Sequence, residues 1–115
     1  MQSHLNHFIL MIIIIILFSG CSLSGESEIE VTVENDPYSA WGSARVLVQS
    51  VVDETAIRGV VINRGNCATH DYGELAKGKN LKYGQSFKAG TLCKLAEIRE
   101  VEVTTEKNTY TFTFN

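Results

Sequence analysis

An unbroken run of eleven apolar residues, Phe8 to Phe18, is the feature that most constrains how this chain can fold. Helical residues rise about 1.5 Å each, so the run covers roughly half of a ~30 Å hydrocarbon core and is too short to span a bilayer comfortably. Its length is typical of the apolar region of a secretory signal peptide, and the small pair Ser19-Gly20 that follows suits a narrow peptidase pocket. A helix buried in a globular core would need polar residues at helical spacing, and this run has none. Folding is therefore expected to depend on the residues after Gly20.

The residues Phe18-Ser19-Gly20-Cys21 resemble the lipobox of bacterial lipoproteins, a resemblance that covers about 21 of the 115 residues. It implies cleavage before Cys21, lipid attachment to the Cys21 thiol and acylation of the new amino group. Ser22 stands where an aspartate tends to hold lipoproteins of enteric-type bacteria at the inner membrane. The resemblance therefore implies a lipid anchor in the outer membrane, facing the periplasm or the cell surface, ahead of inner-membrane anchoring. An uncleaved membrane anchor is the alternative interpretation.

These boundaries divide the chain into a signal peptide (1–20), a short polar tether (21–28) and one small domain (29–115). The formal net charge of −3 argues against nucleic acid as a partner, because phosphate binding requires a basic surface. Five lysines and no acid lie between Leu75 and Ala96. They either face anionic headgroups or an acidic partner, or they protect edge strands from aggregation.

Apolar and polar residues alternate with period two through most of the domain, which predicts strands with one buried face. We expect six strands, at 29–34, 44–52, 56–63, 81–89, 97–104 and 109–115. The second and third are predicted to form a hairpin, as are the last two, and Gly59 suggests a bulge or a close backbone approach. Residues 74–77 allow a helical turn at most. The predicted fold is all-β, a small antiparallel β-sandwich or partly open barrel whose core takes Val31, Val33, Val46, Val48, Val61, Val101, Val103, Tyr110, Phe112 and Phe114.

A loop from Asn35 to Ser43 carries Tyr38 and the one tryptophan of the chain, Trp41. Large aromatic side chains in a loop can anchor a partner, because they bury much area at little entropic cost. A domain this small also needs apolar area for its own core, so we expect Trp41 to fold back and fill it.

Lipidation of Cys21, as the resemblance implies, leaves Cys67 and Cys93, and two remaining cysteines in an exported domain predict a disulfide. Gly65 and Asn66 are expected to take positive φ values and turn the chain into it. Cys67, His70 and Cys93 are also three potential zinc ligands, but no fourth candidate accompanies them. A Cys67–His70 nucleophile pair is the weaker alternative, because the thiol is expected to be oxidised. With no nucleotide-binding motif, we expect no catalytic residue, metal or cofactor, and no enzyme.

The function that these observations predict is a lipid-anchored binding module that docks on an unidentified protein of the cell envelope. Exclusion or immunity factors and accessory subunits of secretion or conjugation machines have this size and build. The alternative is a structural or assembly lipoprotein without a discrete target. Since the strands use their apolar residues for the core, the candidate partner-binding residues lie in loops: Tyr38, Trp41, Arg64 and Tyr72.

Overall fold

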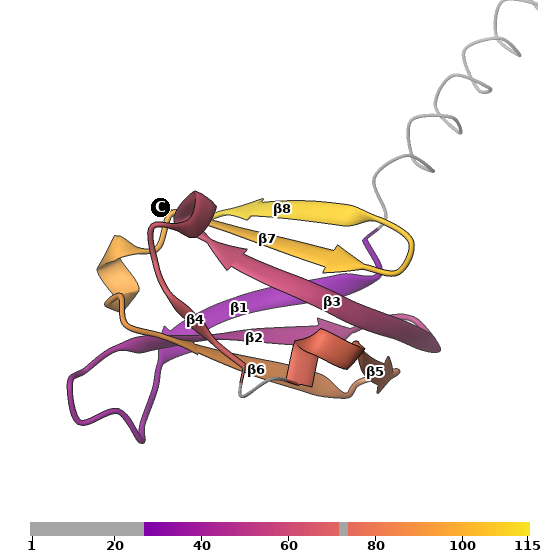
Figure 1. Ribbon diagram of the computed structural model, residues 1–115, viewed down its shortest axis with the longest axis horizontal. Helices are drawn as coiled ribbons and strands as arrows, with labels where there is room; N and C mark the ends of the chain where they lie inside the picture. The colour runs from indigo at the N-terminus through magenta and orange to yellow at the C-terminus, as the bar shows by residue number, and fades with distance from the viewer. Residues whose placement is uncertain (1–26, 72–73) are drawn as a thin grey trace, which may run out of the picture.

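The computed structural model describes residues 27–71 and 74–115, which form a sandwich of two antiparallel four-stranded sheets (Figure 1). The predicted signal peptide, Cys21 and Tyr72 lie outside these residues. The first sheet has the strand order β1-β2-β6-β4 and the second β5-β3-β7-β8. The strands are β1 (Ile29–Asn35), β2 (Ala44–Ser50), β3 (Glu54–Ile62), β4 (Thr69–His70), β5 (Lys79–Lys82), β6 (Ser86–Thr91), β7 (Glu100–Thr105) and β8 (Thr109–Thr113). Three short 3₁₀ turns join them: η1 (Asn63–Gly65), η2 (Glu74–Lys77) and η3 (Leu95–Glu97). The predicted all-β sandwich is confirmed, with eight strands in place of six.

The core lies between the inner faces of the two sheets, as period-two alternation requires. Val46 and Val48 of β2 and Val101 and Val103 of β7 are fully buried, as predicted. The predicted core residues on the edge strands β1 and β8, and Phe114 just after β8, pack against this core but are only half-buried: Val31, Val33, Tyr110, Phe112 and Phe114. The predicted turn at 74–77 is present as η2, which buries Leu75.

The predicted bulge in β3 is confirmed, and it corrects one core assignment. The register with β7 shifts between Ile57 and Gly59, so one extra residue enters β3. An extra residue reverses the alternation of faces. Ile57 points inward before the bulge and Val60 after it, which turns Val61 outward with 39% of its surface exposed. Placing Val61 in the core was therefore wrong.

The predicted hairpin of residues 44–52 and 56–63 is wrong, because β2 and β3 belong to different sheets. β2 pairs with β1 and β6, whereas β3 pairs with β5 and β7. At the end of β2 the backbone N–H groups bond to the chain beside β6 and β1, so they are not available to pair with β3: Ser50 N–H donates to Gln85 O (3.0 Å) and Val51 N–H to Glu28 O (3.0 Å). Residues 51–53 then cross to the other sheet, and three extended residues span about 10 Å, which matches the spacing of packed sheets.

The strand predicted at residues 81–89 places Leu81, Tyr83 and Phe87 on one face by its period-two alternation. A turn at Gly84, whose φ is +81°, instead divides this segment between β5 and β6, one strand in each sheet. Leu81 and Phe87 are buried, but Tyr83 lies in the turn with 71% of its surface exposed. The second predicted hairpin, β7 with β8, is confirmed with Val101 opposite Phe112 and Val103 opposite Tyr110.

Candidate functional site

The segment between β1 and β2, residues 36–43, is the most prominent candidate site, and we call it the aromatic loop. Hydrogen bonds within the loop close it on itself. Asp36 N–H donates to Ser43 O (3.0 Å), and Asp36 Oδ1 accepts from Tyr38 N–H (2.9 Å). Ser39 Oγ accepts from the backbone N–H groups of Trp41 (3.3 Å) and Ser43 (3.1 Å). The loop is therefore a built turn whose shape comes from short polar side chains.

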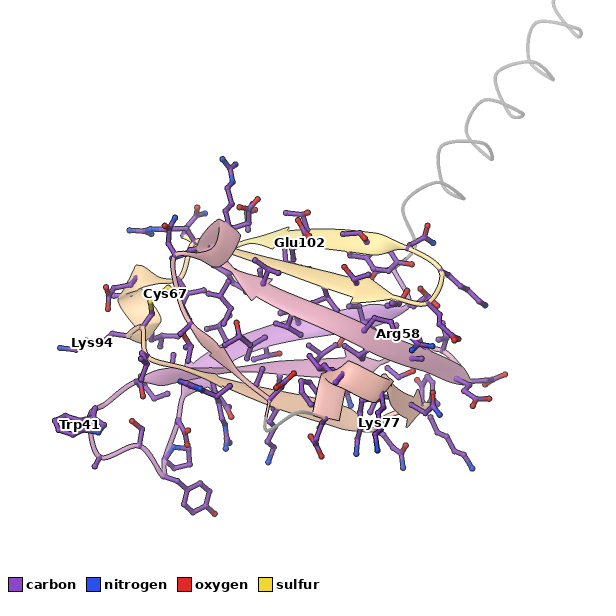
Figure 2. The ribbon with its side chains drawn as sticks, in the orientation of Figure 1. Trp41, Arg58, Cys67, Lys77, Lys94 and Glu102 are labelled. Carbon is purple, nitrogen blue, oxygen red and sulfur yellow. A yellow bond between two sulfur atoms is a disulfide. The ribbon has the colours of Figure 1, made fainter. Side chains whose placement is uncertain are left out.

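This closure directs both large aromatics of the loop into solvent. Tyr38 is 90% exposed and Trp41 is 85% exposed. Figure 2 shows Trp41 on the loop that projects beyond the strands. The expectation that Trp41 fills the core was wrong, because the closed turn prevents it from folding back. At this end of the sandwich the core holds Ala44, the disulfide and Ile98 instead.

The base of the aromatic loop is joined to the disulfide. Ala44 N–H, the first of β2, donates to Cys93 O (2.9 Å), and Cys93 is bonded to Cys67 with a Cα–Cα distance of 5.7 Å. The predicted disulfide is thus confirmed, and it links the segment after β3 in one sheet to the segment after β6 in the other. Leu92, the residue before Cys93, is 69% exposed, and Lys94 lies at the same end of the molecule as Trp41 (Figure 2).

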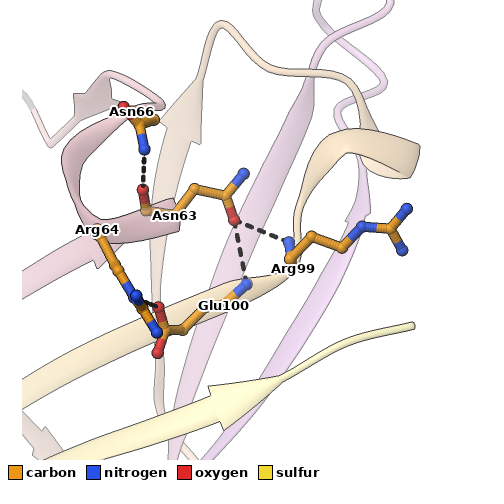
Figure 3. Close-up of polar contacts among 5 residues, drawn as sticks. All are labelled: Asn63, Arg64, Asn66, Arg99 and Glu100. Atoms are coloured by element: carbon orange, nitrogen blue, oxygen red, sulfur yellow. Dashed lines mark hydrogen bonds and ion pairs between the residues drawn. The ribbon is translucent and has the colours of Figure 1, made fainter.

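The second candidate region surrounds η1, where the side chain of Asn63 forms hydrogen bonds to the chain entering β7 (Figure 3). Its Oδ1 accepts hydrogen bonds from the backbone N–H groups of Arg99 (2.8 Å) and Glu100 (3.1 Å). Its Nδ2 donates to Glu97 O (2.8 Å). Three bonds thus join the end of β3 to the chain entering β7. The sequence prediction of positive φ at Asn66 was wrong: Asn66 is right-handed (φ −74°) and donates from its side chain to Asn63 O (3.0 Å).

Positive φ values fall instead on Asn63 (+51°), Arg64 (+57°) and Gly65 (+94°). A left-handed conformation is uncommon for a residue with a long side chain, and here it turns Arg64 outward, with 84% of its side chain exposed. Arg64 Nε pairs with Glu100 Oε2 at 2.8 Å, and Arg64 lines a shallow hollow with Arg99 and Thr113. At this exposure the ion pair contributes little to stability, about 0–1 kcal/mol.

Three of the four predicted binding residues lie in the part of the chain that the structure describes, and they are not brought together. Tyr38 and Trp41 share the aromatic loop of the first sheet, whereas Arg64 follows β3 of the second sheet and pairs with β7. Tyr72 lies outside the described residues. The structure therefore presents an aromatic loop and a separate arginine turn.

The residues considered for metal or nucleophilic chemistry are placed as follows. Cys67 and Cys93 are joined in the disulfide, so neither offers a thiolate. His70 lies on β4, where its backbone is opposite Gly90 of β6. Within residues 27–71 and 74–115, no group of three or more His, Cys, Asp or Glu side chains lies close enough to hold a metal ion.

A group of hydrogen bonds to one carboxylate, that of Glu28, joins the chain entering β1 to the second sheet, and sequence reasoning missed it. Glu28 accepts hydrogen bonds from the hydroxyls of Thr105 (2.8 Å), Tyr110 (2.8 Å) and Thr55 (3.2 Å). Burial alone would raise the pKa of Glu28, but these hydrogen bonds and the nearby charge of Lys107 outweigh burial, so its pKa is lowered. The three hydroxyl residues come from β3, β7 and β8, and no sequence spacing points to their convergence.

No helix in the described ranges has the length and apolarity needed to cross a membrane. Comparison with family models, curated proteins and solved structures found no match. The class that the structure defines is a small disulfide-braced β-sandwich with an exposed aromatic loop.

Proposed function

We propose that this protein is a lipid-anchored binding module of the cell envelope that docks through its aromatic loop on a periplasmic or outer-membrane protein. The observation that carries the proposal is the exposure of Tyr38 and Trp41 on a loop closed by its own hydrogen bonds. Solvent-exposed tryptophan and tyrosine are enriched at the energetic centres of protein interfaces. A loop that already has its bound shape loses little entropy on binding, which favours affinity.

The surroundings of the loop support a protein partner. Leu92, which is exposed, directly precedes Cys93, whose carbonyl accepts the hydrogen bond at the loop base, and Lys94 lies at the same end of the molecule as Trp41 (Figure 2). An apolar centre with a polar rim is the common anatomy of a protein interface. The disulfide behind the loop base holds this surface in place.

The position of the loop also suits an anchored protein. The lipid that the lipobox resemblance implies is on Cys21, before β1, whereas the aromatic loop follows β1. A strand of seven residues spans about 23 Å, so the loop lies one strand length away from the end of the domain where the tether enters. In Figure 1 the two ends of β1 lie at opposite ends of the sandwich. A partner can therefore approach the loop without competing with the membrane for the same surface.

Two classes of envelope lipoprotein fit this proposal: an exclusion or immunity factor that blocks a receptor or toxin, and an accessory subunit of a secretion or conjugation machine. Both need a fixed docking surface on a small anchored domain and neither needs a catalytic site. Arg64 is a candidate for a secondary contact, because its guanidinium is exposed and only its Nε is used by Glu100 among the interactions of the described residues.

The test is capture of the partner from solubilised envelopes by the full-length protein and by a Tyr38→Ala/Trp41→Ala variant. We expect the double variant to capture at least tenfold less partner, since each aromatic contributes about 2 kcal/mol at an interface centre. Tyr83→Ala is the matched control, because Tyr83 is 71% exposed but lies in the turn between β5 and β6, at the far end of β2. Equal capture by the double variant and the wild type, or an equal loss with Tyr83→Ala, would contradict the proposal.

A further inference from the structure

Strand β8 forms one edge of the second sheet, and its outer backbone groups lack a partner within the described part of the chain. Two hydrogen bonds at the ends of the β7–β8 pair establish which groups face β7: Phe114 N–H to Arg99 O (2.8 Å) and Thr105 N–H to Asn108 O (2.8 Å). Hydrogen-bonded and non-bonded pairs alternate along an antiparallel ladder. With the register of β7 and β8, this alternation directs the N–H and C=O groups of Thr109, Thr111 and Thr113 away from the sheet.

The side chains of β8 do not protect this edge. Edge strands are usually guarded by charged side chains, proline or bulges. The sequence of β8, Thr-Tyr-Thr-Phe-Thr, contains none of these, and its register with β7 is continuous. Figure 1 shows β8 along the upper margin of the sandwich, with no described element beyond it.

The other edges carry the protection that β8 lacks. β1 has Glu30 and Glu34, β5 has Lys79 and Lys82, and β4 is only two residues long. If two copies of β1 paired antiparallel about Thr32, Glu30 of one copy would lie opposite Glu34 of the other, and directly opposed like charges are destabilising. Only β8, among the edges of the two described sheets, is both longer than four residues and uncharged.

We infer that β8 is a self-pairing surface and that its occupant is β8 of a second copy of this chain. Antiparallel pairing about a two-fold axis through Thr111 places Thr111 opposite Thr111 of the second copy and Thr109 opposite Thr113. The outward N–H and C=O groups of these threonines then form hydrogen bonds between the two copies. The same register places Tyr110 opposite Phe112 on the inner face. Aromatic and threonine cross-strand pairs are both favourable.

Burial and charge agree with this occupant. Tyr110 and Phe112 point toward the core yet are only half-buried, because no strand continues the sheet beyond β8. A second β8 would cover their exposed edges with the matching aromatics. The nearest acid on the neighbouring strand, Glu102, would be about 14 Å from its counterpart, three strand spacings away, so its repulsion is screened at physiological salt.

Cysteine cross-linking of the full-length protein in cells that express it tests this register. Cells are treated with diamide, and disulfide-linked species are separated on non-reducing gels and identified by mass. We expect Thr111→Cys to give a homodimer, because directly opposed residues of a hydrogen-bonded pair have Cα atoms about 5.5 Å apart, within disulfide range. Thr109→Cys alone is expected to stay monomeric, since its counterpart lies about 14 Å away along the strand. Co-expressed Thr109→Cys and Thr113→Cys chains are expected to cross-link to each other.

Two controls accompany these variants. The wild-type chain measures any cross-linking through Cys21, and Thr32→Cys places a thiol at the exposed centre of the charged edge β1, where no homodimer above the wild-type level is expected. All three β8 positions are threonines on the outer face of the sheet, so the variants leave the core intact. If Thr111→Cys gives no homodimer, gives an adduct with a different protein, or cross-links no better than Thr109→Cys, the self-pairing proposal is wrong.

Discussion

Removal of the disulfide gives a quantitative test of what holds this small sandwich together. The perturbation is the double variant Cys67→Ala/Cys93→Ala. The bridge closes a loop with a sequence separation of 26 residues, and the chain-entropy model then gives a stabilisation of about 3.5 kcal/mol. Cys67 is also buried, so replacing its sulfur by hydrogen leaves a small void that adds to the loss. Total stabilities of small domains are about 5–15 kcal/mol, so the variant should lose a large share of its free energy of unfolding.

The assay is urea unfolding of a chain that begins at Ser22, which keeps every contact of the described domain and excludes the Cys21 thiol. Far-UV circular dichroism should report the transition, because Trp41 is 85% exposed in the folded state and its fluorescence should change little on unfolding. The double variant should lose about 3–4 kcal/mol, equivalent to a fall in Tm of roughly 15–25 °C for a domain of this size. The wild type treated with a reductant should unfold at nearly the same urea concentration as the variant.

The single variant Cys93→Ala separates the bridge from the packing of its sulfur, since it breaks the bond while retaining the buried Cys67 side chain. It should lose most of what the double variant loses. A loss below about 1 kcal/mol in the double variant would refute the reasoning, because the loop-closure term alone exceeds that value.

Three further predictions concern other parts of the molecule. Because the pKa of Glu28 is lowered in the folded state, its ionised carboxylate stabilises the fold above the unfolded-state pKa of about 4.3, and this contribution is lost as the pH falls through the folded-state pKa. Glu28→Gln should therefore cost about 1–3 kcal/mol at pH 7, and the difference from wild type should shrink in acid titrations of stability; a difference that is constant with pH would contradict this. Asn63→Ala should destabilise the domain by about 2–4 kcal/mol in urea unfolding, because it removes three side-chain bonds to the chain entering β7 and a residue that tolerates positive φ, whereas Asn66→Ala, which removes one exposed bond, should cost less than half as much. If the lipobox resemblance is valid, Cys21→Ser should abolish metabolic labelling with a fatty acid and leave the precursor uncleaved, so label retained by that variant would refute the anchor.

Local patterns in the sequence were sufficient to predict most of the strands. Val101 and Val103 alternate with Glu100, Glu102 and Thr104. Because successive side chains of a strand point to opposite faces, this pattern predicts that the two valines are buried, and both are. The β7–β8 hairpin followed in the same way from two alternating segments and a short polar connection. The disulfide was predictable because only two cysteines remained once Cys21 was assigned to lipid.

The same reasoning could not predict which strands pair when the partners are far apart in the sequence. β2 and β3 look like a hairpin locally, since both are rich in β-branched residues and a short polar segment joins them. Whether such a segment reverses the chain within one sheet or crosses to the other depends on which strands occupy the neighbouring positions, here β6 and β7. Those partners are far away in sequence, so no local pattern contains the choice.

For the aromatic loop too, the sequence predicted one part of the result and the tertiary structure decided the rest. Composition identified the loop and its two aromatics, but an aromatic side chain in a loop is equally compatible with the core and with solvent. Hydrogen bonds of Asp36, Ser39 and Ser43 direct Tyr38 and Trp41 outward, and the bond from Ala44 to Cys93 places the loop base at the disulfide. The sequence by itself determined most of the strand-forming segments and most of the residues that they bury, because alternation acts over neighbouring residues. The short strand β4 and the division of residues 81–89 between β5 and β6 came only from the structure. Tertiary structure alone decided sheet order, the convergence of hydroxyls on Glu28 and the unprotected edge at β8, because these depend on backbone groups brought together from distant parts of the chain.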